Sequence, residues 1–142
     1  MIRLLVAALP FAVTASVQAN PLDSISPLEY CEMLAGTMGS AAPKVIAPLV
    51  TMSSVQCRPA EPKNLISMRI DIDLEQDFLM SSGKTANIRE YLAKSVCTSK
   101  HWKEIFARVD MEYKIYSAEQ SLLQRFTLDR EQCQIINALS QR

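Results

Sequence analysis

Histidine occurs only once in this chain of 142 residues, at His101, and the charged side chains balance to a formal net charge of +0. One histidine leaves no cysteine–histidine spacing of the kind that binds structural or catalytic metals. The lack of a basic excess argues against nucleic acid or an anionic lipid surface as a partner. The composition therefore predicts no metal, no cofactor and no polyanionic partner.

Glycine is missing where a nucleotide-binding motif would need it. Residues 81–85 (Ser-Ser-Gly-Lys-Thr) match the end of a phosphate-binding loop, but Phe78 stands where that loop requires its first glycine. An ordinary turn into a helix is the favoured interpretation.

A calcium loop fails for a similar reason. Asp71, Asp73 and Glu75 alternate along one strand face, and carboxylates so placed could hold a hard cation. An EF-hand loop would need glycine at Gln76 and an acidic residue at Ser82. A solvated strand face is therefore the favoured interpretation.

Long apolar runs are absent after the first 19 residues. Residues 1–19 combine a basic start at Arg3, an apolar stretch and small residues before Asn20, which is typical of a cleavable signal peptide. The run is too short and too interrupted for a transmembrane helix. Lipidation is not expected, because the first cysteine is Cys31 and not the residue at the cleavage site. The chain is predicted to be periplasmic or secreted, without direct membrane insertion.

Residues 20–142 are predicted to form a single disulfide-bonded domain, because 123 residues suit one core better than two. Without Arg3 they carry 14 basic and 15 acidic side chains. An even number of cysteines in an exported chain is typical of disulfides, and four cysteines permit three pairings. Proximity along the chain favours Cys31 with Cys57 and Cys97 with Cys133, and the other two pairings stay open.

Capping patterns and periodicity predict three helical regions. Ser26, Pro27 and Glu29 form a capping box ahead of a helix that ends near Gly39. An amphipathic helix is predicted from about Thr85 to Cys97, followed by a short helix around Trp102 to Phe106. A final short helix starts after Asp129, with Gln132 at the capping-box position.

Alternation of apolar and polar residues predicts the strands. Residues 65–74 are the clearest strand, with one face for the core and one for solvent, and residues 49–57 are a candidate neighbour. Residues 111–116 and 122–128 are predicted to form a β-hairpin. The expected fold class is α+β: a two-layer sandwich of about four antiparallel strands with helices on one face, in the order α-ββ-α-ββ-α.

No catalytic residue is predicted. His101 lies four residues after Cys97 and could share a helical face with it, but a cysteine in a disulfide cannot act as a nucleophile. No serine or aspartate spacing supports a triad. The favoured expectation is that the protein is not an enzyme.

Cys97 on a predicted helix precedes a Y-x-I strand at Tyr113 to Ile115, and a returning strand and a closing cysteine, Cys133, follow. This order of elements resembles the AspS-type (GspS-beta) pilotins of type II secretion over about residues 48–133, a family in which a helix cysteine precedes such a strand, a hairpin return and a closing cysteine. The resemblance implies a small α/β domain with a Cys97–Cys133 disulfide. It also implies a function: binding a short segment of an outer-membrane secretin subunit and escorting it. This chain departs from the family in lacking a lipidated cysteine and in carrying the extra helix with Cys31 and Cys57.

We therefore expect an exported accessory protein that binds another envelope protein, pilotin-like in its most specific version. The surface used would be the groove between helices and sheet or an exposed strand edge. A small secreted hydrolase or effector is one alternative, and a structural envelope component is another. The sequence does not predict the oligomeric state.

Overall fold

A computed structural model describes residues 24–141 of the chain. The predicted signal peptide at residues 1–19, and with it the start of the predicted domain at Asn20, lies outside the described residues. Within that described part, no helix has both the length and the hydrophobicity needed to cross a membrane.

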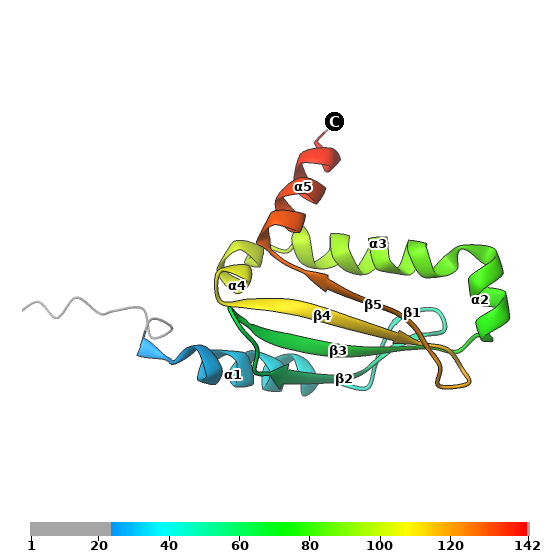
Figure 1. Cartoon of the computed structure of the whole chain (residues 1–142), viewed down its shortest axis with the longest axis horizontal. Coiled ribbons are helices and arrows are strands. Elements are labelled where there is room, and N and C mark those ends of the chain that lie inside the picture. The colour runs from blue at the N-terminus through cyan, green and yellow to red at the C-terminus, as the bar shows by residue number, and fades with distance from the viewer. Residues whose placement is uncertain (1–23, 142) are drawn as a thin grey trace, which may run out of the picture.

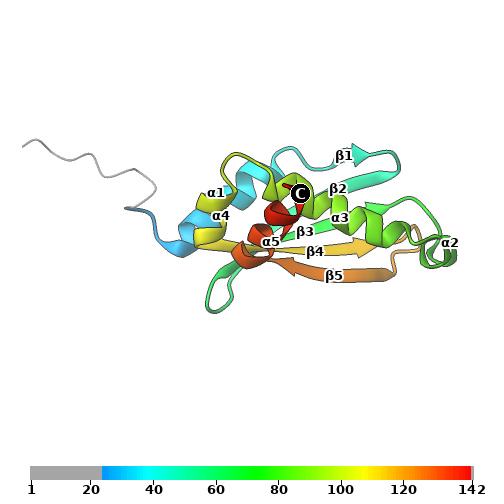
Figure 2. The ribbon, with the colours of Figure 1, turned by 90° about the horizontal axis from the view of Figure 1, so that it is seen from above.

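Five strands form one mixed sheet in the order β1-β2-β3-β4-β5 (Figures 1 and 2). Neighbouring strands are antiparallel except β3 and β4, which are parallel. The strands are β1 (Lys44–Ala47), β2 (Val50–Arg58), β3 (Asn64–Ile72), β4 (Val109–Tyr116) and β5 (Leu122–Leu128).

Five helices accompany the sheet. Their bounds are α1 (Pro27–Gly39), α2 (Gln76–Ser82), α3 (Lys84–Cys97), α4 (Trp102–Arg108) and α5 (Arg130–Ser140). Both capping predictions are confirmed: Ser26 caps α1 with Glu29, and Asp129 caps α5 with Gln132. α3 runs along the sheet, α2 stands at one end of it, and α5 leaves the end of β5 and points away from the strands (Figure 1).

The core lies between one face of the sheet and the helices. In β3, Ile66, Met68 and Ile70 are buried, and in the parallel register they lie beside Met111, Tyr113 and Ile115 of β4. Buried side chains of α1, α3 and α4 belong to the same cluster. The alternate positions of β3 and β4 carry polar side chains on the opposite face, as the alternation in the sequence predicts.

The expectation of about four antiparallel strands needs two corrections. The sheet is mixed because the chain between β3 and β4 passes through α2, α3 and α4. This crossover brings the chain back to the end of the sheet where β3 begins, so β4 runs parallel to β3. β1 is an additional strand at the sheet edge, between Pro43 and Pro48. Prolines are tolerated there because an edge strand does not need every backbone N–H for pairing.

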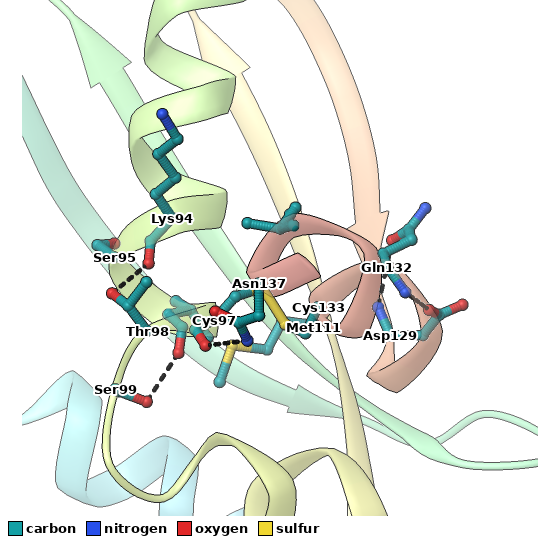
Figure 3. The surroundings of a disulfide bond; sticks show 12 residues. Lys94, Ser95, Cys97, Thr98, Ser99, Met111, Asp129, Gln132, Cys133 and Asn137 are labelled. Carbon is teal, nitrogen blue, oxygen red and sulfur yellow. Dashed lines mark hydrogen bonds between the residues drawn. A yellow bond between two sulfur atoms is a disulfide. The ribbon is translucent and has the colours of Figure 1, made fainter. Parts of the chain in front are cut away.

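One disulfide bonds a helix to the sheet, and a second bonds two helices to each other. Cys31 of α1 is bonded to Cys57 of β2, with Cα atoms 5.5 Å apart, and Cys97 of α3 is bonded to Cys133 of α5, with Cα atoms 5.0 Å apart. These are the two pairs that proximity along the chain favours. The second bond joins the end of the central helix to the helix that follows the hairpin (Figure 3).

Candidate functional site

An apolar groove lies between α3, β5 and α5 on the described residues, with α2 at its far end. Its volume is about 940 Å³. We call it the α3–α5 groove. Its lining consists of Leu79, Met80, Gly83, Thr85, Ala86, Arg89, Glu90, Ala93, Lys94, Leu123, Gln124, Leu128, Gln132, Ile135, Ile136, Leu139 and Ser140.

The lining that α3 contributes to the groove includes two small side chains. Ala86 and Ala93 lie seven residues apart on the helix, which places both on the same side, with Arg89 between them. Alanine covers little of the helix backbone, so a docked chain can approach α3 closely. The stretch from Ala86 to Lys94 spans roughly 12 Å of helix, about the length of two helical turns.

Exposed apolar side chains form the walls. Met80 is 66 % exposed, Ile135 is 55 % exposed and Leu139 is 61 % exposed, and all three line the groove. α5 buries only Cys133 completely, so most of its apolar side has no covering within the described structure. Single exposed apolar residues are ordinary, whereas exposed apolar residues grouped around one groove are an arrangement that ligand-binding grooves share.

α5 is held against α3 at one end. Besides the Cys97–Cys133 bond, the Asn137 side-chain amide donates a hydrogen bond to the Cys97 carbonyl oxygen over 2.8 Å (Figure 3). Both contacts lie at the C-terminal end of α3. These two links therefore set the position of α5, and with it one wall of the groove.

The charged side chains at the groove are already engaged. Lys94 Nζ lies 2.9 Å from Glu90 Oε1 on the same helix, and the Arg89 guanidinium lies 5.0 Å from the centre of the Phe126 ring. No histidine or cysteine lines the groove as described. The site therefore offers apolar contact with a charged border and no nucleophile–base pair.

No family model and no curated protein matches this sequence. Solved structures do match it. A Pseudomonas aeruginosa protein described as secreted aligns with 81 % of this chain and 99 % of its own, with a TM-score of 0.60 and 14 % identity. The pilotin EpsS of the Vibrio vulnificus type 2 secretion system aligns with 75 % of this chain and 91 % of its own, with a TM-score of 0.56 and 11 % identity. The type II secretion pilotin AspS of Vibrio cholerae aligns with 75 % of this chain and 95 % of its own, with a TM-score of 0.56 and 12 % identity.

The chain has the fold of type II secretion pilotins. This confirms the resemblance found in the sequence at the level of fold. Each of these pilotins aligns over more than nine-tenths of its own length, so the likeness covers nearly the whole of each pilotin structure and not only one part of it. At 11 % and 12 % identity the likeness concerns the path of the chain and does not transfer individual residues.

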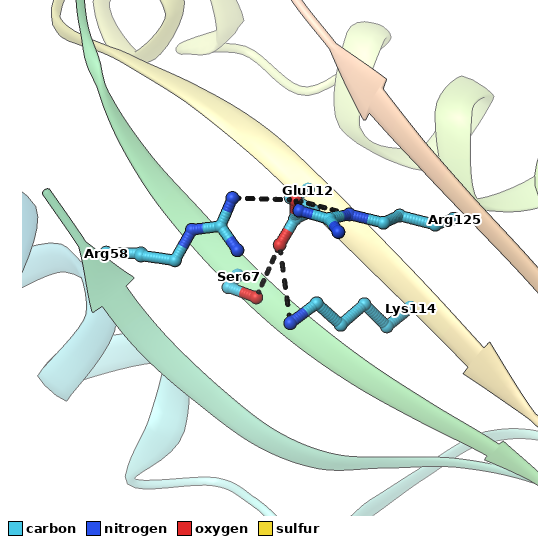
Figure 4. Close-up of polar contacts among 5 residues, drawn as sticks. All are labelled: Arg58, Ser67, Glu112, Lys114 and Arg125. Carbon is cyan, nitrogen blue, oxygen red and sulfur yellow. Dashed lines mark hydrogen bonds and ion pairs between the residues drawn. The ribbon is translucent and has the colours of Figure 1, made fainter. Parts of the chain in front are cut away.

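The uncovered face of the pilotin-like sheet has a charged cluster at its centre (Figure 4). Glu112 of β4 has a side chain only 2 % exposed, and its Oε2 accepts hydrogen bonds from Arg125 Nε at 2.9 Å and Nη2 at 2.6 Å and from Arg58 Nη2 at 3.2 Å. Its Oε1 accepts a hydrogen bond from the Ser67 hydroxyl at 3.0 Å and lies 3.7 Å from Lys114 Nζ. We call Arg58, Lys114 and Arg125 the cationic cluster.

Two acidic groups on this face are stabilised in their charged form. Burial raises the pKa of Glu112, but hydrogen bonds from Arg125 and Ser67 and the charge of Arg58 outweigh it, so the pKa lies below its usual value. Burial likewise opposes ionisation of Asp71, and its hydrogen bonds with Arg69 and Ser53 lower its pKa overall. A carboxyl with a lowered folded-state pKa adds stability above its unfolded-state pKa, and this stability is lost as pH falls through the folded-state pKa.

Glu112→Gln is therefore expected to lower the free energy of unfolding by roughly 2 kcal/mol at pH 7, since hydrogen bonds to a charged group contribute about that much. It should also flatten the loss of stability as the pH falls below about 4.3, the unfolded-state pKa of a glutamate. Urea denaturation at a series of pH values measures both. Glu131→Gln, at an exposed position on α5, is the control. Equal pH slopes in the wild type and Glu112→Gln would contradict the prediction.

Of the motifs that the sequence raised as candidates, only residues 81–85 reach the α3–α5 groove, where Gly83 and Thr85 belong to the lining. Gly83 has φ +68° and joins α2 to α3, a left-handed conformation that favours glycine. Lys84 Nζ lies 5.0 Å from the centre of the Phe78 ring. Residues 81–85 thus form a junction between two helices, and the sequence did not predict the first of them, α2.

The acidic residues and the histidine lie elsewhere. Asp71 contacts Arg69 and Ser53, and residues 24–141 contain no group of three or more potential metal ligands. His101 is exposed at the start of α4, with Nδ1 3.6 Å from Glu104 Oε2, and Cys97 is in a disulfide. The structure brings none of these side chains together with another as a catalytic pair.

Two large side chains on the helices are exposed. Leu139 is 61 % exposed and Tyr91 is 52 % exposed, and the Tyr91 hydroxyl donates a hydrogen bond to the Ile46 carbonyl oxygen over 3.4 Å. The sequence analysis predicts a groove between helices and sheet but does not identify the residues that line it. One sign of it is detectable in the sequence. The final helix carries Ile135, Ile136 and Leu139 as well as Cys133, and these apolar residues cover more of the helix surface than the side that holds Cys133.

Proposed function

We propose that this protein is an exported envelope accessory protein that binds a short amphipathic segment of another envelope protein in the α3–α5 groove. The observation that carries the proposal is the group of exposed apolar side chains around one groove, above all Ile135 and Leu139. An amphipathic helix fits such a groove because its apolar stripe, repeating every three to four residues, can cover both walls.

In its most specific version the function is pilotin-like, and the bound segment belongs to an outer-membrane secretin subunit. Two features support this version: the fold shared with the Vibrio pilotins, and the order of Cys97, hairpin and Cys133 in the sequence. Two disulfides are consistent with an oxidising compartment such as the periplasm. The groove favours binding over hydrolysis, because its charged side chains pair with each other or with an aromatic ring.

A pull-down from solubilised envelope tests the proposal. The bait is the immobilised, oxidised mature chain, and retained proteins are identified by mass spectrometry. We expect a secretin or another envelope-machine subunit to be retained by the wild type and lost with Ile135→Arg, because the arginine places a charge inside the apolar groove.

The matched control is Val45→Arg, which changes another exposed apolar residue, 69 % exposed on β1 and outside the groove. Val45→Arg should retain the same partner as the wild type. Retention of that partner by the Ile135→Arg bait would exclude the groove as the binding site. Absence of any envelope protein from the wild-type bait would count against the accessory function itself and favour the secreted hydrolase or effector.

A further inference from the structure

The cationic cluster on the uncovered sheet face carries more positive charge than its buried carboxylate needs. Three cations surround Glu112: Arg58 from β2, Lys114 from β4 and Arg125 from β5 (Figure 4). Arg125 alone donates two hydrogen bonds to this carboxylate, at 2.9 and 2.6 Å. The single positive charge of this guanidinium already compensates the single negative charge of the carboxylate. Arg58 and Lys114 therefore leave the cluster with a surplus of two positive charges.

Neighbouring charges on the same face do not absorb this surplus. Arg69 is bound to Asp71 by hydrogen bonds of 3.0 to 3.2 Å. Lys63 Nζ lies 4.0 Å from Asp110 Oδ1, so that pair is also balanced. The positive excess of the described sheet face is thus concentrated on the cationic cluster.

The cluster is accessible and held in place. The side chains of Arg58, Lys114 and Arg125 are 43 %, 29 % and 49 % exposed, whereas that of Glu112 is 2 % exposed. Arg58 and Arg125 both donate to the same Glu112 oxygen, so the buried carboxylate holds the two guanidinium groups side by side. Arg58 donates only one of its nitrogens there, and among the described residues its other guanidinium nitrogens contact no acceptor. Preorganised arginines of this kind lose little conformational entropy when they bind an anion.

We propose that the cationic cluster is a second docking surface, which binds an acidic segment of a protein partner through its carboxylates. Carboxylates fit because the guanidinium groups offer planar, paired donors on a flat sheet face. A lipid surface fits less well, since recognition of anionic membranes uses clusters of about four to eight basic residues. The surface lies on the face of the sheet opposite the helices, so its occupant need not compete with a segment in the α3–α5 groove.

The test measures binding of poly-L-glutamate to the oxidised chain by isothermal titration calorimetry at low and moderate salt. The key variant is Arg58→Gln with Lys114→Gln, which removes the surplus and keeps Arg125 on Glu112, so that the fold is preserved. We expect wild-type binding that weakens with salt, and a loss of affinity of roughly tenfold or more in the variant. The charge-matched control is Lys100→Gln with Lys103→Gln, on the helical side, which should weaken binding less than threefold. Circular dichroism shows whether each variant is folded.

Four outcomes would overturn the inference. They are no wild-type binding, equal losses in the two double variants, binding that does not weaken with salt, and cluster-dependent binding to vesicles of phosphatidylglycerol and phosphatidylethanolamine without binding to poly-L-glutamate. The last would assign the surface to lipid. Ile135→Arg should bind poly-L-glutamate as the wild type does, so failure of the groove and failure of the cationic cluster can be told apart.

Discussion

Reduction of both disulfides is expected to unfold most of the protein at 37 °C. The bonds close chain segments with sequence separations of 26 and 36 residues. On the chain-entropy model they stabilise the folded state by about 3.5 and about 4 kcal/mol, respectively. Together these contributions approach the whole net stability of a small domain, about 5–15 kcal/mol. Urea denaturation followed by circular dichroism, with and without a reducing agent, measures the change.

Separate removal of each bond should distinguish their roles. Cys97→Ala with Cys133→Ala is expected to cost about 4 kcal/mol and to release α5, because Cys133 is the only residue that α5 buries completely. Cys31→Ala with Cys57→Ala should cost about 3.5 kcal/mol and leave α5 in place. Hydrogen exchange in α5 reports the difference. Unchanged denaturation midpoints after verified reduction would contradict this account of the stability.

Blocking the α3–α5 groove is expected to weaken partner binding by roughly 100-fold or more, about 2.7 kcal/mol. Leu139→Arg buries a charge against an apolar segment, and Ala86→Trp fills part of the groove beside α3 without adding charge. Leu139 and Ala86 are exposed, so neither change should alter the free energy of unfolding by more than about 0.5 kcal/mol. Fluorescence anisotropy with the labelled segment of the partner identified by pull-down measures the affinity.

The control for this prediction is again Val45→Arg, which adds a charge at an exposed apolar position away from the groove. It should leave the affinity within about twofold of the wild type. If Ala86→Trp binds as tightly as the wild type while Leu139→Arg does not, the segment contacts α5 without entering the groove. Full affinity in both groove variants would place the binding site elsewhere.

Local patterns determined most of the secondary structure. Ser26 with Glu29, and Asp129 with Gln132, mark helix starts because each side chain bonds a backbone N–H that the helix leaves unsatisfied. The alternation from Ile66 to Ile72 marks β3, since successive side chains of a strand point to opposite faces. These patterns do not predict α2 and β1. α2 has no side-chain cap, and β1 is a four-residue edge strand between prolines.

Strand direction and charge distribution required the tertiary structure. Nothing in the residues of β4 indicates that it runs parallel to β3, because direction depends on where the crossover helices return the chain. The near-zero net charge argued against an anionic partner, yet net charge is a sum over the whole surface. Only the sheet register brings Arg58 and Arg125 onto the same carboxylate oxygen, from positions 67 residues apart in the chain.

The sequence by itself determined an α+β chain with one solvent-exposed sheet face, its main helices and strands, and a pilotin-like order of elements. The helices and strands follow from local periodicity and capping, which act over a few residues or one turn, and the pilotin-like order follows from the order of elements and cysteines along the chain. Only the tertiary structure decided the mixed sheet, the α3–α5 groove and the cationic cluster. Each of these is made by residues far apart in the chain, and packing and pairing between distant elements, not local preference, bring such residues together.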